Sequence, residues 1–185
     1  MGPLHADAAA CLSGWTASDA AQESLRQDYL RLLADRPDAM WRTCHPDHLT
    51  ASVLVFSADL RRVALTLHAK AGLWLQTGGH CEPDDRTLAG AALREGAEET
   101  GVDGLSVDPV PVLLSRHEVP FCGPVQPAHH LDVQFVAVAP PDARLTVSEE
   151  SADLAWFAVD DLPVQTDEAV RRLVSSGGRR LRGSL

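Results

Sequence analysis

Residues 79–102 read GHCEPDDRTLAGAALREGAEETGV and place three glutamates close together behind a glycine-rich segment. Positions three and four apart on a helix are surface neighbours, so Glu95, Glu98 and Glu99 would lie within about 100° of one another. Like charges at this spacing repel, and a chain that keeps them together needs a counter-charge. Clustered carboxylate oxygens suit a hard divalent cation such as Mg²⁺ or Mn²⁺. The stretch therefore predicts a helix that carries a metal-binding carboxylate cluster.

The same stretch resembles the Nudix box, in which a glycine, five residues, Glu and seven residues precede R-E-aliphatic-x-E-E-x-G-aliphatic. Its first glycine corresponds to Gly79, and its second half corresponds in order to Arg94, Glu95, Glu98, Glu99, Gly101 and Val102. An isolated E-x-x-E-E segment is usually a solvated helix face with an ordinary i,i+4 ion pair. The resemblance rests on context, because an apolar run, residues 73–76, and the segment GGHCEP precede the glutamates at the right distance.

Three departures from the Nudix pattern fall inside the stretch. Asp85 stands where the family has its first Glu, eight residues rather than seven separate it from Arg94, and Gly96 replaces an aliphatic residue. The loop of residues 84–87 can absorb the extra residue without changing the spacing of the glutamates. Gly96 costs roughly 1 kcal/mol relative to Ala inside a helix, so either a close backbone approach compensates or the site is merely tolerated.

The order of predicted elements indicates an α/β fold. An amphipathic helix is expected at 18–36 and strands at 49–56, 63–68, 73–76, 110–115, 131–139 and 156–159. Asp84 or Asp85 would cap the box helix and Gly101 would end it, with Ala89, Leu93 and Ala97 facing the sheet. Thr166 would cap a last helix that ends at Gly177-Gly178.

The Nudix resemblance implies the same architecture, an α/β/α sandwich around a mixed β-sheet, over about residues 47 to 163. A helical extension, residues 1–46, would precede a Nudix hydrolase domain, residues 47–185. Met40 and Trp41 are expected to anchor the extension on that domain.

For function, the resemblance implies a Nudix pyrophosphohydrolase. Such an enzyme uses Mg²⁺ or Mn²⁺ to hydrolyse a diphosphate linkage in a nucleoside diphosphate joined to another group. Glu98 and Glu99 would bind the metal, Glu95 would be a further ligand or the general base, and Arg94 would orient a glutamate. Gly78 and Gly79 would let the backbone approach the box helix or the metal site closely.

A late loop supplies a second candidate base. Nudix hydrolases often place an acidic residue from such a loop against the metal site, and Glu150, or failing that Glu149, occupies it here. An ordinary surface turn with exposed acids explains these residues equally well.

Histidines form a second group: His80, His117, His129 and His130. In a strand, His130 and Asp132 would face the same side, which allows a contact with substrate or with a catalytic residue. The ordinary role of such histidines is a structural hydrogen bond.

Composition limits the partners. A net charge of −10 argues against non-specific nucleic-acid binding, which needs a basic surface. The five arginines of residues 171–185 are interpreted as a solvated, partly frayed end. Four scattered cysteines and the lack of a signal segment or long apolar run predict a cytoplasmic protein without membrane contact. A nucleotide-type diphosphate is the expected small-molecule partner, and a homodimer stays open.

Two alternatives remain. Isopentenyl diphosphate isomerases share the Nudix fold and carry a Cys in the region of Cys81, whereas the R-E-x-x-E-E tail is the hydrolase form. A non-catalytic nucleotide-sensing domain on a decayed Nudix scaffold would explain Asp85, the extra residue and Gly96. Retention of all three core glutamates argues against that second alternative.

Overall fold

The computed structural model describes residues 2–69, 71–120, 122–146 and 151–183. Within these residues the helices are α1 (Pro3–Gly14), α2 (Ala20–Asp35), α3 (Leu88–Thr100) and α4 (Glu168–Gly183). The strands are β1 (His48–Phe56), β2 (Arg62–His68), β3 (Leu73–Leu75), β4 (Thr77–His80), β5 (Ser106–Val107), β6 (Leu113–Glu118), β7 (His129–Val138) and β8 (Ser151–Ala158).

The centre of the fold is a parallel pair of strands, β1 and β7, which are in register from His48 opposite His130 to Phe56 opposite Val138. The other pairings among the described strands are antiparallel: β4 and β2 pair with β1, β5 and β6 pair with β7, and β3 and β8 pair with β2. The predicted mixed sheet is therefore confirmed.

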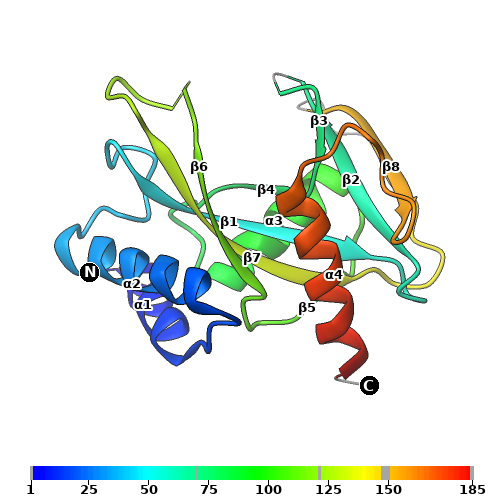
Figure 1. The fold of residues 1–185 in the computed structure, drawn as a ribbon, viewed down its shortest axis with the longest axis horizontal. Helices are drawn as coiled ribbons and strands as arrows, with labels where there is room; N and C mark the ends of the chain where they lie inside the picture. The colour runs from blue at the N-terminus through cyan, green and yellow to red at the C-terminus, as the bar shows by residue number, and fades with distance from the viewer. Residues whose placement is uncertain (1, 70, 121, 147–150, 184–185) are drawn as a thin grey trace.

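Helices cover both faces of this sheet, with α3 behind β1 and β7 and α4 in front of them (Figure 1). Alternate residues of a strand point to opposite faces, so β1 contributes to two cores. Val53 and Val55 belong to the core that includes Leu88 and Ala92 of α3. Leu54 and Phe56 belong to the core that includes Leu173 of α4. This arrangement confirms the α/β/α sandwich.

The N-terminal helices pack on α3 and β6. The Asp7 carboxylate accepts a hydrogen bond of 2.8 Å from the Leu88 backbone N–H at the start of α3, where the helix dipole favours an anion. Trp15 Nε1 donates to the Pro111 carbonyl at 2.6 Å, and the Gln22 side chain pairs with both backbone groups of Leu114. Met40 is buried in the hydrophobic core that includes Leu88 and Ala92 of α3. The division between residues 46 and 47 stays a prediction.

The box helix differs from its prediction at its start. Its N-cap is Thr87, whose side chain accepts from the Gly90 N–H at 3.0 Å, so capping by Asp84 or Asp85 was wrong. Gly101 ends the helix in the left-handed conformation, as predicted. A Cβ on Gly96 would lie 2.6 Å from Val53 Cγ1, so close packing of α3 on β1 compensates for this glycine.

The last helix is longer than predicted. It continues through Gly177 because a Cβ there would lie 2.6 Å from Val136 Cγ1, so the glycine lets α4 sit against the sheet. Its start is capped by Asp167 rather than Thr166. Arg172 pairs with Asp19 at 2.6 Å and Arg180 with Asp108 at 2.8 Å, both from exposed side chains. The basic segment is therefore solvated as predicted, but through Gly183 it is helical, so the predicted fraying is wrong for these residues.

Other elements were missed or misplaced, among them β5, which was not predicted, and β8, which begins at Ser151 rather than at 156. The segment expected as a glycine-rich loop contains β4, helix α1 was not predicted, and the strand expected at 110–115 begins at Leu113.

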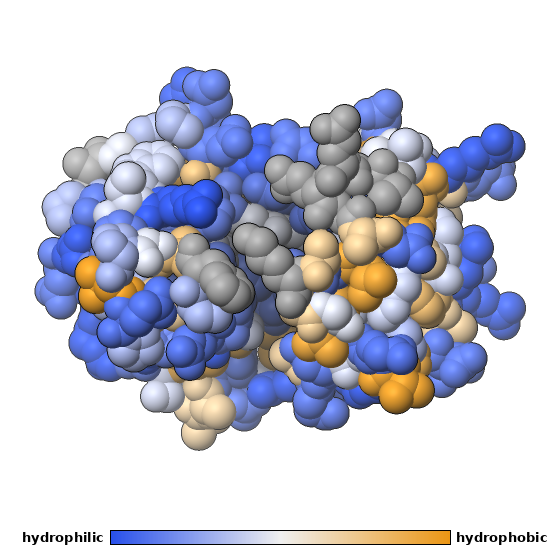
Figure 2. Space-filling model, turned by 90° about the horizontal axis from the view of Figure 1, so that it is seen from above, coloured by the Kyte–Doolittle hydropathy of each residue, from blue (hydrophilic) through white to orange (hydrophobic). Residues whose placement is uncertain are grey.

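The surface seen from above is mostly hydrophilic, and its larger apolar patches gather on the side of β2, β3 and β8 (Figure 2). Within the described residues, every helix is too short or too polar to cross a membrane.

Candidate active site

Two of the three box glutamates meet the glycines of β4. Gly79 faces Glu95, and a Cβ on this glycine would lie 2.7 Å from Glu95 Oε1. The Gly78 backbone N–H donates a hydrogen bond of 2.7 Å to Glu99 Oε1. Because both glycines lack a side chain, β4 can lie close to the Glu95 and Glu99 carboxylates of α3.

Arg94 supplies the counter-charge that the sequence required. Its Nη1 lies 3.0 Å from both Glu95 Oε1 and Glu98 Oε2, so one guanidinium nitrogen joins two glutamates. Its Nη2 also donates to the His80 carbonyl at 3.0 Å, which ties α3 to the end of β4. The orienting role of Arg94 in catalysis stays a prediction.

Asp85 lies on the other side of the same guanidinium. Arg94 donates to both of its oxygens, at 3.2 and 3.1 Å, and the Glu82 backbone N–H donates to it at 2.7 Å. Only 7% of the Asp85 side chain is exposed. The shortened and shifted acid therefore anchors Arg94 and the preceding loop in this structure.

The acids differ in exposure. The side chain of Glu95 is 15% exposed and that of Glu98 is 59% exposed. Burial raises the pKa of the Glu95 carboxyl, and the neighbouring Arg94 opposes this effect. Glu98 is thus exposed to solvent, whereas Glu95 is mostly buried.

A cluster of histidines and one cysteine occupies the other face of β4. His48, His80, Cys122 and His130 bring one ligand atom each to within 4.8 Å of one another. Burial, together with the neighbouring imidazoles, lowers the pKa of His80 to about 4 and that of His130 to about 3. His80 and His130 are therefore uncharged at neutral pH, and burial also lowers the pKa of His48.

The sequence singled out His80 and His130 but missed His48 and Cys122. His48 lies beside His130 in the β1–β7 ladder, and His117 of β6 lies on its other side. These pairings are not visible in the sequence, because a single chain does not reveal strand register.

Asp132 does not join the histidines. Its carboxylate accepts hydrogen bonds from the hydroxyls of Thr50 at 3.1 Å and Ser52 at 2.6 Å, and from the Gln134 amide at 3.2 Å. His129 also lies apart from the cluster and bonds to Asp47 at 3.0 Å.

The late-loop acids Glu149 and Glu150 lie outside the described residues. Thr146, just before them, is described, and its N–H donates to the Thr100 carbonyl at 2.8 Å. Thr100 directly follows Glu99, so the chain approaches the box helix as it enters this segment.

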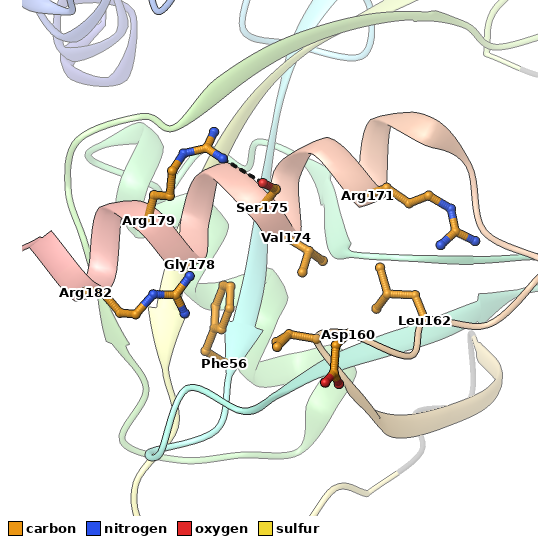
Figure 3. Close-up of a pocket in the computed structure, with 10 residues that line it drawn as sticks. Phe56, Asp160, Leu162, Arg171, Val174, Ser175, Gly178, Arg179 and Arg182 are labelled. Carbon is orange, nitrogen blue, oxygen red and sulfur yellow. Dashed lines mark hydrogen bonds between the residues drawn. The ribbon is translucent and has the colours of Figure 1, made fainter.

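A cavity of about 480 Å³ runs along α4, away from the glutamates. Arg171, Arg179 and Arg182 line it from the helix, and Asp160 and Leu162 line it from the segment after β8 (Figure 3). None of the predicted site residues lines this cavity.

We expect Gly79→Ala to lower kcat by about tenfold or more with little loss of stability. The added methyl group would displace the Glu95 carboxylate, and misplacing a reacting group by about 1 Å can cost a hundredfold in rate. Glu95 is a flexible side chain, so it can move without disturbing the core. The matched control is Gly14→Ala, whose Cβ would meet nothing within 4 Å. Equal kcat values for the two variants would contradict a role for Gly79.

Comparison with solved structures supports the fold. A NUDIX-family hydrolase from Clostridium perfringens is 22% identical and matches with a TM-score of 0.60, over 72% of this chain and 97% of its own. An Ap4A hydrolase from C. elegans is 16% identical, with a TM-score of 0.61 over 73% and 98%. The E. coli dihydroneopterin triphosphate pyrophosphohydrolase is 16% identical, with a TM-score of 0.59 over 71% and 95%.

The search of curated proteins found no match. The family model of the NUDIX domain matches residues 46–175, which include the parallel strand pair, the box helix and the first half of α4. Because this match covers more than half of the chain, the chain belongs to the Nudix family.

Proposed function

We propose that this protein is a divalent-metal-dependent pyrophosphohydrolase. It would cleave a diphosphate linkage in a nucleoside diphosphate joined to another group. The observation that carries the proposal is the packing of the carboxylates of Glu95 and Glu99 against the two glycines of β4, with Glu98 beside them. An ordinary solvated helix face has no need of such packing.

The residues fit a hard divalent cation. Glu95, Glu98 and Glu99 offer only oxygen ligands, which Mg²⁺ and Mn²⁺ prefer, and Glu98 remains open to solvent. These three residues would hold the metal. When bound, it would neutralise charge on phosphate oxygens and lower the pKa of a bound water.

The protein's own groups supply positioning and proton transfer. Arg94 holds the carboxylates of Glu95 and Glu98 in one arrangement, and the Gly78 N–H fixes that of Glu99. Preorganised groups of this kind lower the cost of reaching the transition state. Either Glu95 or Glu150 would accept the proton of the attacking water.

We expect Glu150→Gln to lower kcat by about 10²- to 10⁴-fold, with little change in KM, because loss of a general base costs about this much. Glu149→Gln is the neighbouring comparison, and it tests the second acid of the loop. Steady-state kinetics on both single variants and the double variant provide the measurement. Wild-type kcat in all three would exclude the loop and leave Glu95 as the base.

The substrate class is supported by the names of the structural neighbours. One is an Ap4A hydrolase and another is a dihydroneopterin triphosphate pyrophosphohydrolase. A screen with Mg²⁺ should include nucleoside triphosphates, nucleotide sugars, dinucleotide polyphosphates and isopentenyl diphosphate. We expect cleavage of at least one nucleotide-type compound and none in excess EDTA. Isomerisation of isopentenyl diphosphate, with no cleavage of any nucleotide, would overturn the proposal.

The isomerase-like alternative finds little support at Cys81. This cysteine is 6% exposed, and its burial raises the pKa of its thiol to about 12, so it is not a reactive thiolate. The sensor alternative is weakened by Gly96 and Asp85, because close packing explains the first and the Arg94 pair explains the second. A cytoplasmic location remains a prediction.

A further inference from the structure

We propose that His48, His80, His130 and Cys122 form a tetrahedral zinc site, separate from the glutamate cluster. Three imidazole nitrogens and one thiolate are a ligand set of the kind that zinc takes in proteins. The four residues come from β1, β4, β7 and the β6–β7 connection, so a bound ion would join segments that are distant in the sequence.

The sulfur–nitrogen distances match a zinc tetrahedron. With Zn–S about 2.3 Å and Zn–N about 2.05 Å, a tetrahedral angle places sulfur and nitrogen about 3.6 Å apart. Cys122 Sγ lies 3.7 Å from His48 Nε2 and 3.5 Å from His80 Nε2. Both of these sulfur–nitrogen separations therefore match a zinc tetrahedron already.

His48 has the hydrogen bond expected of a zinc ligand. Its Nδ1 lies 3.2 Å from the Cys44 carbonyl, to which it would donate, and this bond leaves the Nε2 lone pair toward Cys122. Metal-bound histidines almost always donate the other ring N–H to such an acceptor. His48 is fully buried, so this orientation is held by its surroundings.

His130 provides an independent sign of a missing partner. Its Nε2 is buried and makes no hydrogen bond, although buried polar atoms are normally paired. The ring lies 4.9 Å, centroid to centroid, from the rings of both His48 and His80. A shared metal ion would satisfy this nitrogen.

The zinc site and the glutamate cluster lie on opposite faces of β4. Gly79 faces Glu95, so the next residue, His80, points to the other face of the strand. The two clusters also differ in chemistry, with nitrogen and sulfur on one face and only carboxylate oxygen on the other. Zinc should therefore prefer the first and Mg²⁺ the second.

Four protein ligands leave no open coordination position, which is the mark of a structural site. Cys122 lies in the β6–β7 connection. A backbone hydrogen bond of 2.8 Å from the Val119 N–H to the Ala128 carbonyl joins the two ends of this connection. The ion would clamp this connection across the starts of β1 and β7 and the end of β4. Binding would release the thiol proton.

The test uses the full-length protein and does not depend on its activity. Protein purified without chelator should contain about one zinc per chain by elemental analysis. After removal of this zinc, added Co²⁺ should give tetrahedral ligand-field bands and a sulfur-to-cobalt charge-transfer band. X-ray absorption of the zinc form should give one sulfur and three nitrogen neighbours, which tests the site even if a variant does not fold.

Cys122→Ser should abolish the charge-transfer band and weaken metal binding by about a hundredfold or more, since even outer partners of a ligand contribute 10–100-fold. His130→Ala should weaken binding and retain the band. Cys11→Ser is the matched cysteine control and should behave as wild type. Glu98→Gln should also keep the band, which separates this site from the proposed hydrolase site.

A wild-type protein with neither zinc nor a Co²⁺ charge-transfer band would overturn the proposal. So would a band that survives Cys122→Ser. If the protein hydrolyses its substrate but fails these tests, the proposed function still stands. If it binds zinc but has no hydrolase activity, the zinc site still stands.

Discussion

Replacing Glu98 or Glu99 with Gln is expected to lower kcat by about 10²- to 10³-fold while the protein stays folded. A metal ligand contributes several kcal/mol of charge stabilisation in the transition state, and each 1.36 kcal/mol changes the rate tenfold. Gln is nearly isosteric with Glu, and it removes the negative charge without opening a cavity. The measurement is kcat with saturating Mg²⁺, accompanied by a thermal unfolding curve.

The matched control is Glu168→Gln, at the start of α4 and remote from the box, which should retain wild-type kcat. Full activity of either box variant would contradict the assignment of its ligand role. Wild-type turnover in excess EDTA would contradict metal dependence itself.

Replacing Arg94 with Met is expected to lower the free energy of unfolding by about 3 kcal/mol and to lower kcat as well. Removing one partner of a buried ion pair costs about 3–5 kcal/mol, and we take the lower end because 22% of the Arg94 side chain is exposed. Asp85 would be left almost fully buried without its counter-charge. Denaturant unfolding and steady-state kinetics measure the two effects.

A double variant separates the two roles of Arg94. Arg94→Met with Asp85→Asn should regain part of the lost stability, because Asp85, the most buried of the charges that Arg94 pairs, would no longer lack a counter-charge. It should not regain kcat, because Glu95 and Glu98 would still lack their shared nitrogen. Recovery of both would mean that Arg94 acts on stability alone.

Asp85→Ala should reduce kcat less than Glu98→Gln, because Asp85 contacts Arg94 and is one step removed from the glutamates. A loss equal to that of Glu98→Gln would show that Asp85 performs the function of the first Glu of the family pattern.

The sequence was sufficient where the signal is local. Helical spacing alone predicted that Glu95, Glu98 and Glu99 share one side of α3, and the αL glycine at Gly101 ended the helix as expected. The Nudix resemblance also predicted the mixed sheet and its two helical layers, which the structure confirms.

The sequence was insufficient where distant segments decide the outcome. Gly177 resembles a helix stop, yet packing against Val136 and Phe56 favours a continuous helix. His48 and Cys122 are separated by more than seventy residues and meet only because β1 and β7 pair in one register. Asp85, a predicted cap, instead pairs with Arg94, and Thr87 caps the helix; local spacing does not reveal this pairing.

The most direct test of the central claim is a titration of Mn²⁺, followed by electron paramagnetic resonance, in the Cys122→Ser background. That background removes the proposed zinc site and leaves the box glutamates. The account predicts that a Glu98→Gln, Glu99→Gln double variant in this background binds Mn²⁺ at least about a hundredfold more weakly than its parent. Equal, negligible binding by both proteins would contradict the account and favour a non-catalytic sensor.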